Sequence, residues 1–337
     1  AKRTMNTNHK PISSNRVVVA GAAGWIGQAV CRDLLSEGKQ VIALDRAGSV
    51  GDWSEFIAID IASDAGMSAA RASELVSGAV ALIHCAGYAH RPIETAEEVE
   101  RFFAINRDGT RRVVELCEAV GISRVVYLSS IAFYDWELLA GQPATEYAQL
   151  SSSTAYARSK LDGESIVRES ALDWRVLRLA TVYGAGDRAN FSKLAVALKT
   201  GRFLIPGSGD ARKSVIEVNR AAEYICRFSA VDAPTHRLVN LGFSKSPTLS
   251  EICGAYSEQC GFNPPMRLPL WFINVAAFCG DLLSKLKPNF PLTSVNVGKL
   301  TRSTCVDSSR AVEMFPELAS MEFADELKQS ADYYRAL

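Results

Sequence analysis

The chain has 337 residues, of which 48% are hydrophobic and 22% charged, an ordinary globular composition. Lys+Arg and Asp+Glu both number 37, so the net charge is +0 and no basic field is available to hold a nucleic-acid backbone. The four His residues show no metal-ligand spacing, and the eight Cys residues form no C-x-x-C pair. We therefore expect a reduced, cytoplasmic protein without a metal site or a nucleic-acid partner, built as one large domain and a smaller one.

Two segments bear on targeting and membranes. Residues 1–15 are polar and lack the apolar core of a signal peptide, so we expect a disordered leader. The longest apolar stretch, Leu268 to Leu286, is interrupted by Pro269, Asn274 and Asp281, and it is too short and too polar to span a bilayer. We expect it to form a packed amphipathic helix, and a helix lying on a membrane surface is the alternative.

Residues 17–27 place a β-branched run directly before Gly21, Gly24 and Gly27. This pattern predicts a strand, a tight turn and a helix start, where backbone N–H groups and the helix dipole bind a pyrophosphate. The next apolar run ends on Asp45, within the roughly 20-residue spacing at which an acid reaches the ribose hydroxyls. Asp45 favours NAD because it would repel a 2′-phosphate, whereas Arg46 is able to pair with that phosphate and leaves NADP open.

Strand-like and helix-like segments alternate through the first half of the chain. After 17–20 and 41–44, the expected strands are 56–59, 80–83, 125–128 and 175–179, separated by expected helices at 66–77, 96–120 and 155–171. Because these strands are continuously apolar, they predict an α/β fold, a doubly wound parallel sheet of the Rossmann type with helices on both faces.

Beyond about residue 184, Gly and Pro become frequent and the expected strands become short. This change indicates a smaller C-terminal substrate lobe. We assign residues 16–183 to the dinucleotide-binding domain, with strand and helix returns around 214–242, and residues 184–213 and 243–337 to the substrate-binding lobe.

A set of hydroxyl and amine side chains follows the strand at 125–128. Ser129 and Ser130 end this strand, and Tyr156 and Lys160 are four residues apart on one face of the next helix. A phenol with a pKa of about 10 is a poor base at neutral pH, but a neighbouring ammonium favours the phenolate. The order of these residues after a nucleotide turn predicts hydride transfer at an alcohol carbon, with Tyr156 as the base and Lys160 lowering its pKa. A half-buried Tyr and a solvated Lys are the structural alternative.

The chain resembles the extended short-chain dehydrogenase/reductase family, particularly its NAD-dependent sugar-nucleotide epimerase/dehydratase branch, from about residue 16 to the C-terminus. Seven motifs carry this resemblance in the family's order: the glycine turn, Asp60-Ile61, His84-Cys85-Ala86-Gly87, Asn106-x-x-Gly109-Thr110, Leu128-Ser129-Ser130-x-x-x-Tyr134, Tyr156-x-x-x-Lys160 and Leu177-Arg178-x-x-x-Val182-Tyr183-Gly184.

The resemblance implies roles for individual residues. The catalytic residues would be Ser130, Tyr156 and Lys160. NAD would contact a set that runs from the glycine turn to the end of the sheet: Gly21, Gly24, Trp25, Ile26, Gly27, Asp45, Arg46, Asp60, Ile61, Cys85, Ala86, Gly87, Asn106, Ser129, Tyr156, Lys160 and Val182. A nucleotide-sugar substrate would contact Ser130, Tyr134, Asn190, Arg212, Lys213 and Arg302.

Some of these residues also have a structural interpretation. Tyr134 would then pack in the core, and the turn around Lys213 would be a solvated surface turn. Family members usually carry Arg at the position of Lys213, so the phosphate role is able to pass to Arg212. The resemblance also implies a homodimer through a bundle of the helices at 96–120 and 155–171.

The expected function follows from the presence of Ser130, Tyr156 and Lys160 and from the replacement of the acidic residues that dehydratases carry. Dehydratases of this branch follow their catalytic Thr with Asp-Glu, whereas Ile131-Ala132 follow Ser130 here, so dehydration is disfavoured. We expect an NAD-dependent sugar-nucleotide 4-epimerase that acts by reversible hydride transfer through a 4-keto intermediate. The alternatives are an NAD(P)H-dependent reductase or dehydrogenase of a keto sugar or another small carbonyl compound or alcohol, and, less favoured, a non-catalytic dinucleotide sensor.

Overall fold

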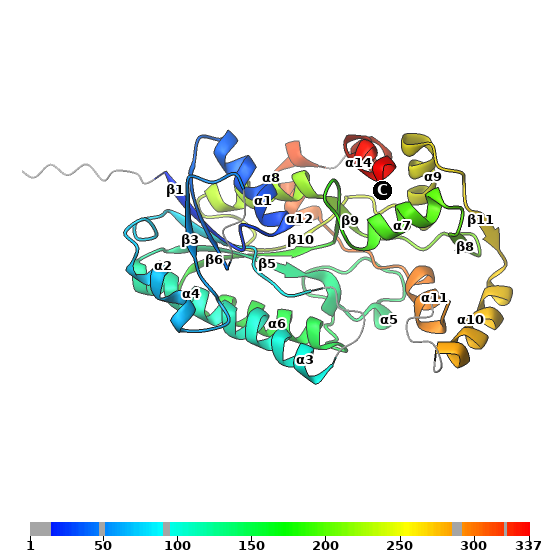
Figure 1. Cartoon of the computed structure of the whole chain (residues 1–337), viewed down its shortest axis with the longest axis horizontal. Helices are drawn as coiled ribbons and strands as arrows, with labels where there is room; N and C mark the ends of the chain where they lie inside the picture. The colour runs from blue at the N-terminus through cyan, green and yellow to red at the C-terminus, as the bar shows by residue number, and fades with distance from the viewer. Residues whose placement is uncertain (1–14, 47–50, 90–94, 285–291, 320–321) are drawn as a thin grey trace, which may run out of the picture.

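The computed structural model describes residues 15–46, 51–89, 95–284, 292–319 and 322–337 (Figure 1). The leader that we expected at residues 1–15 lies outside the described residues, except for Asn15.

Seven strands form one parallel sheet in the order β10-β6-β5-β4-β1-β2-β3. The strand order reverses between β1 and β4, and ligands of doubly wound sheets bind at such a reversal, beyond the carboxyl ends of the strands. The predicted Rossmann-type fold is therefore confirmed. The strands are β1 (Arg16–Ala20), β2 (Gln40–Asp45), β3 (Glu55–Ala58), β4 (Ala81–His84), β5 (Arg124–Ser130), β6 (Asp173–Leu179) and β10 (Leu238–Leu241).

Helices cover both faces of this sheet (Figure 1). Successive strand residues alternate between two cores, so that Val17 and Val19 belong to one, and Val18 and Ala20 to the other. Because both faces are buried, nearly every strand position is apolar. One face is covered by α1 (Trp25–Ser36), α8 (Val218–Ala230) and α12 (Ser309–Met314), and the other by α2 (Ser68–Ala72), α4 (Thr110–Val120) and α6 (Ala155–Glu169).

Two helices differ from the sequence-based expectation. The helix expected at 66–77 consists of a 3-10 turn (Ala65–Met67) and α2, and it ends early because the Ser73 hydroxyl accepts a hydrogen bond from the Leu75 nitrogen at 3.2 Å. The helix expected at 96–120 consists of α3 (Ala96–Phe102), a π turn (Phe103–Gly109) and α4.

The later part of the chain builds a third core beside the carboxyl ends of the strands. Two short parallel strand pairs and several helices enclose it. These elements are β7 (Thr181–Tyr183) with β9 (Val215–Glu217), β8 (Leu204–Pro206) with β11 (Met266–Leu268), α7 (Asn190–Lys199), α9 (Leu249–Cys260), α13 (Phe323–Leu327) and α14 (Ala331–Ala336).

Some residues outside 16–183 nevertheless belong to the sheet unit. Within 214–242, α8 packs on α1 and β10 pairs with β6. Ala311, Phe315 and Leu318, which we assigned to the substrate lobe, lie in the core between the sheet and α8. The chain therefore returns to the nucleotide-binding unit after most of the lobe has been built.

Two helices, α10 (Leu270–Ser284) and α11 (Ser294–Thr301), form a helical pair at one end of the molecule (Figure 1). The expected helix is present and packs against α11 on one face, but its other face is apolar and exposed rather than polar. Only Ile273, Ala277 and Gly280 of α10 are buried, because α11 covers a narrow stripe of the helix. Within the described residues, no helix has both the length and the apolar character needed to cross a membrane.

Candidate active site

The glycine turn joins β1 to α1 and brings distant backbone segments into contact. Gly21 has a φ of +83°, and a Cβ there would lie 2.4 Å from the Ala86 nitrogen. A Cβ at Gly27 would lie 2.1 Å from the Gly21 carbonyl oxygen. Gly24 is the N-cap residue of α1 and offers no side-chain hydrogen bond. This leaves the first N–H groups of α1 available to an anion.

Asp45 ends β2, and its carboxylate is tied to this turn. Asp45 Oδ2 accepts a hydrogen bond from the Ala23 nitrogen at 2.9 Å, and Oδ1 accepts one from the Arg46 nitrogen at 2.7 Å. The Arg46 side chain is exposed. The fold thus brings together the acid and the glycine turn that the sequence indicated as two parts of one site.

Asp60 and Ile61 follow β3 and shape the next loop. Asp60 Oδ1 accepts a hydrogen bond from the Ala62 nitrogen at 2.9 Å. Ile61 is buried, and a Cβ on Gly109 would lie 2.9 Å from Ile61 Cδ1. The carboxylate therefore already has a local role, and contact of this pair with a cofactor stays a prediction.

Cys85, Ala86 and Gly87 follow β4 beside the glycine turn. The Cys85 and Ala86 nitrogens both donate to the carbonyl of Ala20, at 2.8 and 2.9 Å, which extends the end of β4 along β1. A Cβ on Gly87 would meet nothing closer than 3.5 Å and would lie 3.8 Å from Lys160 Nζ. Gly87 therefore leaves space beside its backbone, next to the Lys160 amine.

Asn106 holds the segment after Gly87 in place. It lies in the π turn and is buried. Its Oδ1 accepts from the Tyr88 nitrogen at 2.8 Å, and its Nδ2 donates to the Tyr88 carbonyl and to Ser159 Oγ, both at 3.0 Å. Single π turns within helices recur at functional sites because the extra residue changes the direction of a side chain. Asn106 therefore joins the loop after β4 to α6.

The three predicted catalytic residues come together at the end of β5. Ser130 is the last residue of β5, and Tyr156 lies in the first turn of α6, one turn before Lys160. The Thr154 hydroxyl accepts from the Ala157 nitrogen at 3.1 Å and so fixes where α6 begins. A side-chain hydrogen bond joins Tyr156 to Ser130.

Burial dominates the acid–base properties of Tyr156 and Lys160. It raises the pKa of Tyr156 above its usual value, and the hydrogen bond with Ser130 offsets part of this rise. Burial also lowers the pKa of Lys160 to about 8. Lys160 Nζ donates to the Leu128 carbonyl at 2.6 Å and lies 4.4 Å from the centre of the Tyr127 ring. The pKa of Tyr156 is thus raised in the cofactor-free protein, and its lowering by Lys160 together with a bound nicotinamide stays a prediction.

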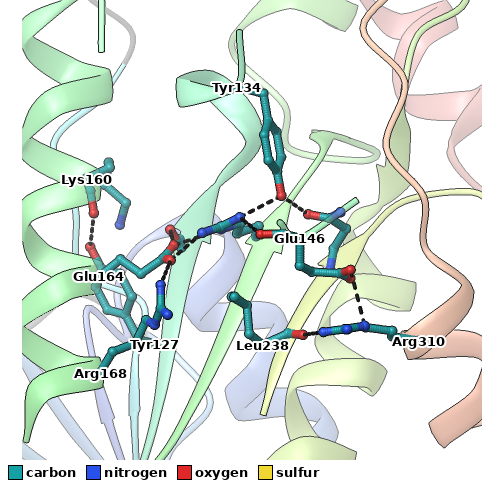
Figure 2. A network of polar contacts seen from close by, with 11 residues as sticks. Tyr127, Tyr134, Glu146, Lys160, Glu164, Arg168, Leu238 and Arg310 are labelled. Carbon is teal, nitrogen blue, oxygen red and sulfur yellow. Dashed lines mark hydrogen bonds and ion pairs between the residues drawn. The ribbon is translucent and has the colours of Figure 1, made fainter. Parts of the chain in front are cut away.

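A buried ion pair joins helix α6, which carries Tyr156 and Lys160, to strand β6 (Figure 2). The sequence analysis did not identify this pair. Arg178 Nη2 donates to Glu164 Oε1 at 2.6 Å, and Arg178 Nε donates to Glu164 Oε2 at 3.0 Å, with both side chains buried. Ser129 Oγ also donates to Glu164 Oε2, at 2.7 Å. Glu164 follows Tyr156 and Lys160 at intervals of four residues, so its place on the same helix face was readable in the sequence.

Tyr134 belongs to the same buried network (Figure 2). Its hydroxyl donates to Asn240 Oδ1 and accepts from Arg178 Nη1, both at 2.7 Å. The Asn240 nitrogen in turn donates to Glu146 Oε1 at 2.8 Å. Tyr134 is 2% exposed, which agrees with the core role that the sequence left open, and its place at the border of a sugar pocket stays a prediction.

Trp25 connects the start of α1 to the loop after β7. Its Nε1 donates to the Ala185 carbonyl at 2.7 Å. Trp25, Ile26 and Val182 all pack against the core on the α1 side of the sheet. The structure therefore places Val182 on the same core as Trp25 and Ile26, although it is far from them in the sequence.

Lys213 is engaged within the protein. Its Nζ donates to the Lys299 carbonyl at 2.7 Å and also to the Arg302 carbonyl, so the amine caps the C-terminal end of α11. Burial lowers the pKa of Lys213 to about 8. Two of the three N–H donors of the Lys213 ammonium therefore bond to backbone carbonyls, so the residue is not simply solvated, and a phosphate role for it stays a prediction.

The other expected substrate residues lie nearer to solvent. Arg212 Nη1 donates to the Ser246 carbonyl at 2.8 Å, and Arg302 Nη2 pairs with Glu137 Oε1 at 2.8 Å. Asn190 begins α7 and is exposed. The structure brings Lys213 and Arg302 into contact, and a shared role of Asn190, Arg212 and Arg302 in holding a substrate stays a prediction. Within the described residues, no group of three or more His, Cys, Asp or Glu side chains is placed to hold a metal ion.

Comparison with known proteins agrees with this geometry. The model of the NAD dependent epimerase/dehydratase family matches residues 17–242. The chain belongs to this family. It is therefore an enzyme of the NAD-dependent epimerase and oxidoreductase type, and its cofactor is NAD.

Two curated relatives carry different names. One is an N-acetyl-α-D-glucosaminyl-diphospho-ditrans,octacis-undecaprenol 4-epimerase of Escherichia coli O157:H7, 23% identical over 62% of this chain and 65% of its own length. This chain thus spans about two thirds of that relative. The other is a ceramide reductase of Caulobacter vibrioides, 27% identical over 95% of this chain and 94% of its own length.

Among solved structures, a UDP-glucose 4-epimerase of Thermotoga maritima with UDP-glucose is similar to this chain. The TM-score is 0.72 at 20% sequence identity, covering 95% of this chain and 99% of that one. This likeness shows that the whole chain, lobe included, shares the fold of that structure.

The residues around the glycine turn fit NAD. The turn has no side-chain cap on α1, Asp45 is bonded to it, and Gly87 leaves space next to Lys160. In this family enzyme, the turn would hold the pyrophosphate, Asp45 the adenine ribose and Lys160 the nicotinamide ribose.

Proposed function

We propose that this family member is a sugar-nucleotide 4-epimerase that acts by reversible hydride transfer through a 4-keto sugar. The observation that carries the proposal is the hydrogen bond between Ser130 and Tyr156 one turn before Lys160, with Ile131 and Ala132 in place of acidic dehydration residues. A paired hydroxyl and phenol move one proton, whereas dehydration also needs an acid and a base for water.

The chemistry of each side chain follows from its surroundings. NAD, when bound, accepts a hydride from the alcohol carbon and returns it. Ser130 Oγ orients the substrate hydroxyl, and Tyr156 Oη takes its proton in one direction and gives it back in the other. The raised pKa of Tyr156 keeps the phenol protonated in the cofactor-free protein. The positive charges of Lys160 and of the bound nicotinamide favour the phenolate that removes the proton.

The substrate proposal is a nucleoside diphosphate sugar. Arg212 and Arg302 are the cations proposed for its diphosphate, since both are exposed and Lys213 is engaged. The pair of Arg302 with Glu137 would exchange for a phosphate oxygen, which a guanidinium binds through two parallel donors. Relatives that share this fold include a structure with UDP-glucose bound.

A reductase is the second candidate, and two observations favour it. One relative that matches nearly the whole chain is named a ceramide reductase, although another matched over 94% of the chain is named a UDP-glucose 4-epimerase. Arg46 is exposed directly after Asp45, where it is able to pair with the 2′-phosphate of NADP. Net reduction consumes NAD(P)H, whereas epimerisation returns the hydride to the same molecule.

The test incubates the purified protein with UDP-hexoses and UDP-N-acetylhexosamines and follows C4 configuration by NMR and NADH by absorbance. Interconversion of one C4 pair without net NADH consumption is the expected result, and Tyr156→Phe abolishes it. Stoichiometric oxidation of NAD(P)H with a keto substrate, and no interconversion of any pair, would establish the reductase instead.

A homodimer through α3, α4 and α6, and a cytoplasmic location, stay predictions. Light scattering of the purified protein tests the dimer, and fractionation of cells tests the location.

A further inference from the structure

Helix α10 lies at one end of the molecule (Figure 1) and exposes many of its large apolar side chains to solvent. Among the described residues, seven of the fifteen exposed large apolar side chains lie on this one helix. Trp271, Val275, Phe278 and Leu282 are 69%, 60%, 64% and 54% exposed. Folded proteins rarely expose so many large apolar groups together unless the surface binds something. We call these four residues the apolar stripe.

The apolar stripe lies opposite the face that α11 covers. Its members are spaced by four, three and four residues, which places them on one side of the helix. Ile273, Ala277 and Gly280 form the buried side, roughly half a turn away at 100° per residue. Phe272 and Leu283 flank the stripe and are also exposed. The exposed apolar arc spans about 140°, wider than the seam that pairs two helices.

The described charges in this part of the chain are mostly positive. Within residues 266–284 and 292–302 the cations are Arg267, Lys299 and Arg302, and the only carboxylate among these described residues is Asp281. Asp281 Oδ1 accepts a hydrogen bond from the Ser294 nitrogen at 2.9 Å, so this acid serves the start of α11. Arg267 and Lys299 are exposed. The helical pair and the strand before it thus carry three described cations and one carboxylate that is engaged at the start of α11, and this balance of charge favours a bilayer with anionic headgroups.

The width and chemistry of the surface favour a bilayer over a protein partner. A helix that pairs with another protein carries charged residues beside its seam, which set register and partner choice. Here one flank holds Phe272, Cys279 and Leu283, and the other holds Asn274 and Asp281, whose carboxylate is bonded to the Ser294 nitrogen. Trp271 stands at the start of the helix, and Trp is enriched where apolar and polar layers of a membrane meet. The helix is 15 residues long, about 22 Å, too short to cross.

We propose that the pair of α10 and α11 binds this enzyme to the surface of an anionic lipid bilayer, with the apolar stripe buried among the acyl chains. The helical pair of α10 and α11 is linked to residues that we propose to hold the substrate. Lys213 caps α11, and Arg302 after it pairs with Glu137 in α5 (Trp136–Leu139), which follows the Ser130 strand end. Docking therefore places the substrate lobe at the membrane. The inference does not depend on which reaction the enzyme catalyses.

The experiment uses the full chain with NAD and vesicles of phosphatidylcholine, either alone or mixed equally with phosphatidylglycerol. We expect co-sedimentation with the mixed vesicles, weaker binding to phosphatidylcholine alone and at high salt, and a blue shift of the Trp271 emission that Trp271→Phe removes. The double variant F278E/L282E should weaken binding by more than about tenfold. Val80→Glu, at a similarly solvent-exposed apolar residue before β4, is the matched control and should bind normally.

Three outcomes would overturn the proposal. One is the absence of vesicle binding by the wild-type chain, and another is binding that the double variant leaves unchanged. The third is a dimer of the wild-type chain that the double variant dissociates, without any vesicle binding, because a second copy would then cover the stripe. Circular dichroism and NAD binding check that each variant is folded.

Discussion

Glu164 and Arg178 join α6 to β6 through two hydrogen bonds of 2.6 and 3.0 Å, in a site closed to solvent. The pair lies one helical turn after Lys160, and Arg178 also donates to the Tyr134 hydroxyl at 2.7 Å. The helix that carries Tyr156 and Lys160 is thus held to the sheet by a charged bond as well as by apolar packing. Glu164 and Arg178 therefore have a structural role, which is to hold in place the helix that carries the proposed catalytic residues.

Removing one partner of this ion pair should destabilise the protein strongly. Glu164→Gln leaves the Arg178 charge buried without its counter-ion, and we expect a loss of about 3–5 kcal/mol of unfolding free energy. Arg168→Met is the control, since Arg168 contacts the same carboxylate at 3.4 Å but is 43% exposed. It should cost less than about 1 kcal/mol. Urea denaturation measures both, and equal costs would contradict the argument.

Substitution of Tyr156 should reduce activity, whereas substitution of Tyr134 should reduce stability. Tyr156→Phe removes the proton-transfer group, so turnover should fall by about 10²–10⁴-fold with little change in unfolding free energy. Tyr134→Phe leaves Arg178 and Asn240 short of a buried partner and should cost about 1–3 kcal/mol. Its turnover should stay close to wild type. Steady-state kinetics and denaturation on the same preparations check both, and the reverse pattern would exchange the roles assigned to the two side chains.

The pKa of Lys160 predicts a pH dependence of stability in the cofactor-free protein. Burial lowers this pKa from 10.5 to about 8, so between these values the unfolded chain binds a proton that the folded chain has lost. Unfolding free energy should therefore rise with pH from about 8 to 10.5, by about 3 kcal/mol, and stay flat below about pH 8. The rise is measured relative to Lys160→Met, which cancels other titrating groups. Parallel curves for the two proteins would refute the shift.

A methyl group on Gly87 should interfere with the cofactor and leave the fold intact. A Cβ there meets nothing closer than 3.5 Å, so Gly87→Ala should change unfolding free energy by less than about 1 kcal/mol. It should weaken NAD binding by about tenfold, because the methyl occupies the space beside Lys160. Gly254→Ala in α9, with nothing within 4 Å, is the control and should bind NAD normally. Calorimetric titration with NAD decides, and unchanged affinity in Gly87→Ala would remove this residue from the site.

Substitution of Lys213 should affect stability, whereas substitution of the adjacent Arg212 should affect substrate binding. Lys213→Met frees the carbonyls of Lys299 and Arg302 and should cost about 1–2 kcal/mol of stability. Arg212→Ala should leave stability nearly unchanged and weaken binding of a UDP-sugar by about tenfold. Thermal unfolding and UDP titration test the pair. A loss of UDP binding on Lys213→Met, with normal stability, would restore the phosphate role to this lysine.

The sequence predicted the sheet and its nucleotide turn because these features are local. Continuous apolar strands mark a sheet covered on both faces, and glycines at Gly21, Gly24 and Gly27 are required where backbone meets backbone. The spacing of Tyr156 and Lys160 placed both on one face of a helix, and the structure keeps them beside Ser130. Such patterns follow from the periods of the strand and the helix, which can be read from a short segment of the sequence without knowing its distant contacts.

Other properties depended on which segments meet in three dimensions. Apart from Arg168, the partners of Glu164, Tyr134 and Lys213 come from residues between 14 and 106 positions away, and no local period encodes them. The raised pKa of Tyr156 and the lowered pKa of Lys160 arise from burial, which exists only once the sheet and α6 have packed. The exposed face of α10 was decided in the same way. Its amino acids are apolar on most sides, and only the position of α11 determines which of them solvent reaches.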